Sequence, residues 1–275
     1  MKVCRRRLFE FLLVLAGLTF SLTACTQRSH VPPPQSYPPP ASSHATPQPS
    51  SSGPAVVEKC FIDASIPKTT THEVAPLETI WRISKMYGIS PEAIYSANGL
   101  KPGETLRIGQ KLIIPSAKGM RNVIPLYPNP KWKYVIVHHT ATDIGKALQV
   151  HRAHEDRGFW NGLGYHFLID NGTLGKGDGQ IEVSPRWIKQ QNGAHCKAGG
   201  MNEVGIGVAL VGNFNTDLPT QKQLQALTYL LGTLCRYYHI PPRNVKGHRD
   251  VQGAATDCPG SRFPWQSVRP CLTAY

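Results

Sequence analysis

Acidic residues and long apolar runs are both scarce in this chain of 275 residues. It has 17 Asp and Glu against 30 Lys and Arg, which gives a formal net charge of +13. This balance suits an anionic partner, such as nucleic acid, a membrane face or an acidic cell-wall polymer, and charge alone does not choose among them. The apolar run from Phe11 to Leu22 is too short for a helix that spans a bilayer ~30 Å thick.

That short run has the shape of an export signal, because four basic residues lie within positions 1–7 before it and small residues follow it. The sequence Leu-Thr-Ala-Cys at 22–25 resembles the lipobox of bacterial lipoproteins. The resemblance implies a signal peptide over 1–24, a lipid anchor on Cys25 and a place in the cell envelope. Thr26 would favour the outer membrane, facing the periplasm, if the host has one. An ordinary secretory signal with a chance cysteine is the alternative.

Export would leave an odd number of cysteines in an oxidising compartment. Five cysteines follow Cys25: Cys60, Cys196, Cys235, Cys258 and Cys271. If one of them binds a metal, four remain that could pair, in any of three ways.

The prolines are unevenly distributed, and nine of the 24 fall within residues 26–56. No core can form from such a stretch, which should be an extended polyproline II spacer. We therefore assign residues 25–65 to a lipidated cysteine and a Pro-rich linker.

Residues 70–116 are predicted to form a small β-α-α-β module. Ser90 and Pro91 are an N-cap and a first helical residue, and Gly88 ends the preceding helix. The segments Tyr-Ser-Ala-Asn-Gly-Leu at 95–100 and Gly-Gln-Lys-Leu-Ile-Ile-Pro at 109–115 resemble a LysM domain. The resemblance implies binding of N-acetylglucosamine-containing glycans through the loops at 76–79 and 100–103.

Residues 125–275 are predicted to form an α/β domain. Buried-type strands are expected at 134–137, 165–170 and 205–212. An amphipathic helix is expected from Thr220, its N-cap, to Tyr238, with further helices at 144–156 and 263–272.

Four residues of this domain are candidate ligands of a catalytic zinc, which takes three protein ligands and keeps one open position. His138 and His139 end a strand, His248 lies in a loop, and Cys258 follows ten residues later. Each residue alone is weak evidence for a metal site, because a strand-end histidine is usually structural and Cys258 could belong to a disulfide.

The ordered set of motifs is more specific. It comprises Val-Ile-Val-His-His-Thr-Ala at 135–141, Gly-Tyr-His-Phe at 164–167, Gly-Ala-His at 193–195, Ile-Gly-Val at 206–208 with Val-Gly-Asn-Phe at 211–214, and Gly-His-Arg-Asp at 247–250 with Cys-Pro-Gly at 258–260. This set resembles the zinc-dependent N-acetylmuramoyl-L-alanine amidases, a family that includes phage T7 lysozyme and the peptidoglycan-recognition proteins. The resemblance implies a mixed β-sheet flanked by helices.

It also implies the metal ligands His138, His248 and Cys258, with Asp257 as the competing candidate for the third. Since neighbours on a strand point to opposite faces, His138 and His139 should not share one role. A metal pair at His151 and His154 is disfavoured, because the family places its zinc elsewhere.

The family has two branches that differ in a catalytic side chain. One branch has a Glu at the position of Ala209, and the other uses the Tyr that aligns with Tyr165. The chain therefore goes with the lysozyme and recognition-protein branch. The resemblance further implies that Thr256 donates a hydrogen bond to the developing oxyanion. It places His195, Arg186 and Trp187 along the substrate groove.

The sequence thus predicts an exported, lipid-anchored enzyme that uses Zn²⁺ to cleave the amide between N-acetylmuramic acid and L-alanine. Its partners should be peptidoglycan and, through the anchor, a membrane. We do not expect it to bind nucleic acid, and we expect it to be a monomer. The alternative is a non-catalytic peptidoglycan-binding or envelope-tethering lipoprotein. Non-catalytic relatives typically lack the cysteine ligand, and Cys258 is present.

Overall fold

The computed structural model describes residues 55–60, 67–159 and 162–273. The predicted signal peptide, Cys25 and most of the predicted linker lie outside these residues. Strand β1 (Ala55–Cys60) lies within the segment 25–65 that we predicted to be a linker. β1 pairs antiparallel with β4 (Arg121–Leu126), with Ala55 opposite Leu126.

The LysM-like module consists of β2 (Lys68–Glu73), α1 (Ile80–Tyr87), α2 (Pro91–Asn98) and β3 (Lys111–Ala117). Its two strands pair antiparallel. Thr79 and Ser90 cap the helix starts with their side chains, and Gly88 and Gly99 end the helices in the left-handed conformation. The core of the module is apolar and buried, with Ile83, Ile94, Leu112 and Ile114 at its centre.

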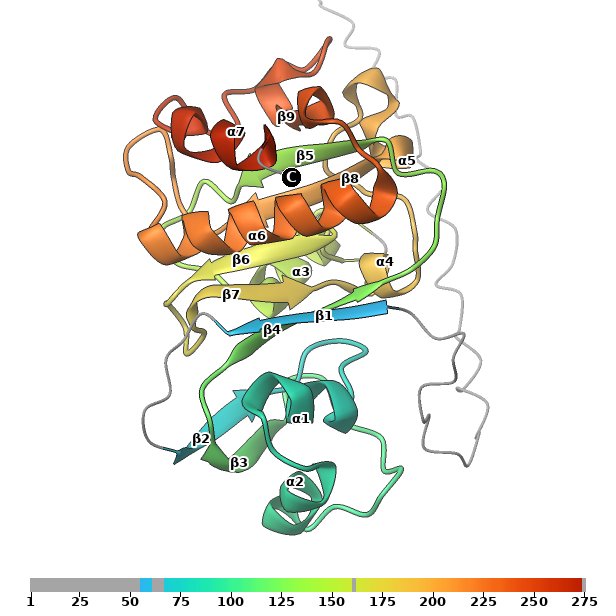
Figure 1. Ribbon diagram of the computed structural model, residues 1–275, viewed down its shortest axis with the longest axis vertical. Helices are drawn as coiled ribbons and strands as arrows, with labels where there is room; N and C mark the ends of the chain where they lie inside the picture. Colours follow the sequence, from blue (N-terminus) through green and yellow to red (C-terminus); the bar gives the residue numbers. More distant parts are fainter. Residues whose placement is uncertain (1–54, 61–66, 160–161, 274–275) are drawn as a thin grey trace, which may run out of the picture. The chain divides into compact units, whose positions relative to one another are not determined.

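The larger α/β part is built on a five-stranded sheet in the order β7-β6-β8-β5-β9 (Figure 1). The strands are β5 (Tyr134–His139), β6 (Phe167–Asn171), β7 (Asp178–Val183), β8 (Gly205–Leu210) and β9 (Val245–Gly247). β7 is antiparallel to β6, and the other pairs are parallel. The predicted mixed sheet is confirmed.

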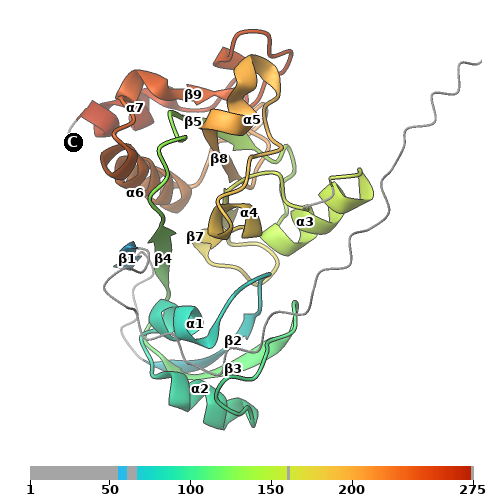
Figure 2. The same ribbon diagram turned by 90° about the vertical axis from the view of Figure 1, so that its right-hand side faces the viewer.

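Helices cover both faces of this sheet. α6 (Gln221–Tyr238) and α7 (Trp265–Thr273) lie on one face, and α3 (Ala147–Asp156) lies on the other (Figure 2). Because side chains alternate along a strand, Val137 and Val208 pack toward α6, whereas Leu168 and Ala209 pack toward α3. The short helices α4 (Pro185–Ile188) and α5 (Met201–Val204) lie in the connections. Within the described residues, no helix combines the length and apolarity needed to cross a bilayer.

Strand β4 takes part in two hydrophobic cores. Val123 is buried in the core of the LysM-like module, whereas Ile124 and Leu126 are buried in the core of the large sheet. The Asn122 side chain donates to the Gly179 carbonyl at 3.0 Å and accepts from the Ile181 amide at 2.8 Å, which ties β4 to β7. The two parts of the described chain therefore share a strand.

The pairing that we considered for four cysteines is not found in the described side chains. Cys196, Cys235 and Cys271 are all free thiols, and the side chain of Cys60 lies outside the described residues. Cys196 is buried beside Ile136 and Met201, and Cys235 packs from α6 onto the large core. These two sulfurs thus act as small apolar groups within separate clusters.

Candidate metal centre

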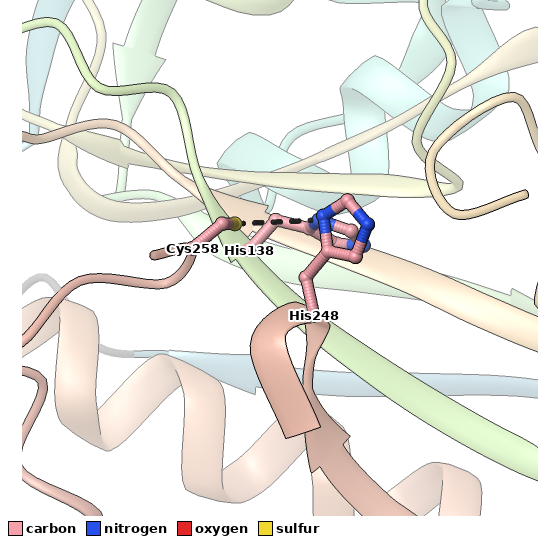
Figure 3. Close-up of side chains that lie close together, drawn as sticks. All are labelled: His138, His248 and Cys258. Carbon is pink, nitrogen blue, oxygen red and sulfur yellow. Dashed lines mark hydrogen bonds between the residues drawn. The ribbon is translucent and has the colours of Figure 1, made fainter. Parts of the chain in front are cut away.

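Three side chains from separate segments converge at the carboxyl end of β5 (Figure 3). His138 is the fifth residue of β5. β9 pairs with β5 so that Gly247 lies opposite Val137, and this register brings the next residue, His248, beside His138. Their ring centroids are 4.7 Å apart. The loop of Cys258 is held by a 2.8 Å hydrogen bond from the Arg249 amide to the Cys258 carbonyl.

The donor set and its spacing fit a zinc ion. His138 Nδ1 lies 3.5 Å from Cys258 Sγ, and one ligand atom from each of the three residues falls within 4.8 Å of the others. Zinc takes nitrogen at about 2.0–2.1 Å and sulfur at about 2.3 Å in tetrahedral geometry, which separates two such atoms by about 3.6 Å. No other group of three potential ligands was found among the described residues. Asp257, the competing third ligand, is exposed and outside this group.

The neighbouring His139 has a different role, as strand alternation requires. Its ring points to the other face of the sheet, where Nδ1 accepts a hydrogen bond from the Phe214 amide at 3.1 Å. Its backbone amide donates to Cys258 Sγ at 3.4 Å. His139 therefore supports the cysteine through its main chain and stays out of the cluster.

Burial sets the protonation of the cluster. It lowers the pKa of His138 well below its usual value, and the neighbouring His195 and His248 lower it further. Burial also raises the pKa of the Cys258 thiol to about 12. The imidazole is thus neutral and offers a lone pair, and a metal that binds the sulfur must displace its proton.

Tyr165 and Thr256 border the cluster. The Tyr165 ring centroid is 5.1 Å from that of His138, and burial raises the pKa of the phenol, with the Cys258 charge adding to the effect. Ala209 lies opposite His138 in the sheet register, so a Glu there would face the same side. Thr256 Oγ1 accepts from the Cys258 amide at 3.2 Å, which leaves its own hydrogen available to donate.

His195 does not line a groove, in contrast to our expectation. His195 is only 9% exposed, and its ring contacts that of His138, with His195 Nδ1 3.1 Å from His138 Nε2. Burial lowers the pKa of His195 to about 3. The residue contacts the candidate ligand and not the solvent side of the site.

Arg186 and Trp187 are likewise buried, so their predicted place along the groove is wrong. The Arg186 guanidinium donates to the carbonyls of Leu163 and Asn192, both at 2.9 Å. Trp187 is fully buried in the large core and donates through Nε1 to the Pro125 carbonyl at 2.7 Å. Both side chains thus have hydrogen-bond partners on the main chain, as buried polar groups usually do.

The side chains of His151 and His154 on α3 hold the loop that follows the helix. His151 Nδ1 accepts from the Leu163 amide at 3.1 Å, and His154 Nδ1 accepts from the Gly164 amide at 3.0 Å. The sequence reasoning assigned no role to His166. Its Nδ1 accepts from the Gly207 amide at 2.9 Å, and its position in the Gly-Tyr-His-Phe motif was the only signal for it.

Two known protein families match parts of this chain. Residues 128–261 match the N-acetylmuramoyl-L-alanine amidase family, and residues 72–115 match the LysM domain family. Peptidoglycan-recognition protein SC2 of Drosophila melanogaster is 31% identical over 145 residues, which are 50% of this chain and 72% of that protein. The chain belongs to the amidase and peptidoglycan-recognition protein family.

Other members of the amidase and peptidoglycan-recognition protein family match over different lengths. Peptidoglycan-recognition protein 2 of Holotrichia diomphalia is 37% identical over 102 residues, and the match covers 34% of this chain and about half (49%) of that protein. Among solved structures, the N-acetylmuramoyl-L-alanine amidase LysC of Clostridium intestinale is 30% identical, with 54% of this chain and 91% of that chain covered and a TM-score of 0.44.

Proposed function

We propose that the chain is a zinc-dependent amidase that hydrolyses the amide between the muramoyl lactyl group and L-alanine in peptidoglycan. The observation that carries the proposal is the complete set of His138, His248 and Cys258, whose ligand atoms lie within 4.8 Å of one another, with His138 Nδ1 and Cys258 Sγ 3.5 Å apart, close to the spacing in tetrahedral zinc sites. A chain that only binds peptidoglycan has no need of this set.

The surrounding residues support amide hydrolysis. Zinc in this site would supply Lewis acidity to the scissile carbonyl and to an attacking water. Tyr165 keeps its proton because burial raises the pKa of the phenol, so it can donate to the carbonyl oxygen as negative charge develops. Thr256 can donate a second hydrogen bond from its unused hydroxyl hydrogen. Water then adds its oxygen to the carbonyl carbon, the carbon–nitrogen bond breaks, and the alanine nitrogen takes a proton.

The remaining parts of the chain support delivery of the enzyme to its substrate. The LysM domain would hold the glycan strand. Without residues 1–24, which carry four basic residues and one acidic residue, the net charge would be +10, which suits an acidic wall. A lipid on Cys25, followed by the Pro-rich segment, would anchor the enzyme in the envelope. An envelope-tethering protein without catalysis is the alternative, and the names of the recognition-protein relatives state recognition alone.

A digestion assay separates the two. Purified sacculi are incubated with the mature chain and zinc, and newly freed L-alanine amino termini are counted, with a chelator added in parallel. We expect release that stops with the chelator and with Cys258→Ser, while sedimentation of the variant with sacculi persists. Cys271→Ser makes the same change at a thiol outside the cluster and should release alanine normally. No release by the wild-type chain with zinc present would refute the proposal.

A further inference from the structure

The His195 ring lies at the end of a short hydrogen-bonded chain that leads to the candidate metal ligand. His195 Nε2 is 3.2 Å from the Gly205 carbonyl oxygen, and His195 Nδ1 is 3.1 Å from His138 Nε2. The other nitrogen of His138, Nδ1, is the one that lies 3.5 Å from Cys258 Sγ. The Gly205 carbonyl, the His195 ring and the His138 ring are therefore connected by consecutive hydrogen bonds.

The carbonyl at the start of this hydrogen-bonded chain fixes where the protons are. A carbonyl oxygen can only accept, so the hydrogen of the His195 ring is on Nε2. In the neutral ring, Nδ1 of His195 is then an acceptor, and Nε2 of His138 must donate to it. His138 is left with a bare lone pair on Nδ1, the atom that faces Cys258. The Gly205 carbonyl thus selects the tautomer of His138 through the His195 ring that lies between them.

The His195 ring is also held by the shape of its surroundings. A Cβ atom added at Gly193 would lie 2.3 Å from His195 Cδ2, and one added at Gly207 would lie 2.4 Å from the same atom. Neither glycine has a positive φ, so space, and not backbone conformation, explains the absence of a side chain there. Asn202 fixes the loop, because its Oδ1 accepts from the amides of His195 and Cys196, both at 2.8 Å.

We propose that His195 is a positioning residue that fixes the tautomer and ring orientation of His138, so that His138 Nδ1 is presented to the metal. The inference rests on the metal centre of the proposed function and adds a residue that does not touch substrate. Partners of this kind commonly account for a factor of about 10 to 100 in metal affinity when they are removed. We predicted that His195 would line the substrate groove, but its ring is buried and contacts the candidate ligand His138.

The test measures zinc affinity by competition with a chromophoric chelator, independently of amidase activity. His195→Phe keeps a ring but removes the acceptor, and it should weaken zinc binding about 10- to 100-fold. His195→Asn places an amide oxygen where Nδ1 was and should recover most of the affinity. Gly207→Ala keeps the His195 side chain in the sequence, but the added Cβ atom would push the His195 ring away from His138. This variant should therefore also weaken zinc binding. In the metal-free wild type, nitrogen NMR of the imidazoles should show the proton of His138 on Nε2.

His166→Phe is the matched control. His166 is a fully buried imidazole whose two nitrogens meet backbone groups at Gly207 and Gln191, with no hydrogen bond to His138. Its loss should lower thermal stability and leave zinc affinity unchanged. Unchanged zinc affinity in His195→Phe, equal losses in the Phe and Asn variants, or a His138 proton on Nδ1 would each overturn the inference. Absence of zinc binding by the wild-type chain would instead refute the proposed function, and the NMR measurement would still decide the tautomer.

Discussion

Tyr165 is the residue on which the proposed chemistry depends most directly after the ligands themselves. Its ring lies against His138, and burial raises the pKa of its hydroxyl, so the group is a hydrogen-bond donor over the whole range in which the protein would work. We expect Tyr165→Phe to lower the rate of alanine release about 100- to 1,000-fold, as loss of one oxyanion donor does in other hydrolases. Initial rates on purified sacculi provide the measurement.

Zinc affinity and thermal stability serve as the controls for this variant, because Phe keeps the ring that packs on His138. Both should match the wild type. A variant that released alanine at the wild-type rate would show that Tyr165 only packs against the ligand, and Thr256 would then be the remaining candidate donor.

The residues of the metal centre could be predicted because each sits in a motif at a strand end or in a loop that follows one. The buried roles of His195, Arg186 and Trp187 could not. Arg186 and Trp187 find their partners at Leu163, Asn192 and Pro125, in segments far from them in the sequence. A polar or aromatic side chain gives no local sign of whether such a partner will cover it.

Among the elements, the junction of β2 and α1 carries a buried charge cluster with a clear pH dependence. Glu78 Oε2 lies 2.7 Å from His72 Nε2, and Glu78 Oε1 lies 2.9 Å from Arg82 Nη1. Burial alone would raise the pKa of Glu78, but His72 and Arg82 outweigh it and lower the pKa to about 2. Because the folded-state value is depressed from 4.5, the stabilisation is complete above pH 4.5 and is lost as the pH falls toward 2.

We therefore expect the free energy of unfolding to drop by about 2 kcal/mol more between pH 5 and pH 3 in the wild type than in Glu78→Gln. Urea unfolding at a series of pH values measures the difference. Glu92→Gln removes an exposed carboxylate from α2 and should follow the wild-type curve. Parallel curves for the wild type and Glu78→Gln would mean that the cluster contributes nothing to the pH dependence.

Elements with strong local signals were predictable, and those that depend on a distant partner were not. The capping box of α6, in which Thr220 and Gln223 bond each other's backbone, follows from the Thr at its start and the apolar stripe behind it. β1 follows a Pro-rich stretch and is defined only by its pairing with β4, some 60 residues later. Its short apolar segment carries too little periodicity to be recognised by itself.

At the scale of the whole described chain, the shared strand β4 should make the LysM and amidase parts unfold together. Val123 and Ile124 are neighbours in sequence and belong to different cores, and Asn122 bonds to β7. Loss of either core would leave β4 with one face uncovered. A ligand that binds only one part should then stabilise both.

Zinc is such a ligand under the proposed function. At about 100 times its dissociation constant it should stabilise the fold by about 2.7 kcal/mol. Hydrogen exchange should then slow about 100-fold for the amides of β5 that exchange only by global unfolding. If the two parts are one cooperative unit, the amides of Ile83 and Ile94 in the LysM core should slow by the same factor, although both lie in helices distant in sequence from the ligands. Cys258→Ser, which lacks one ligand, should show neither effect. Slowing in β5 with no change at Ile83 and Ile94 would mean that the LysM core opens on its own, despite the strand it shares.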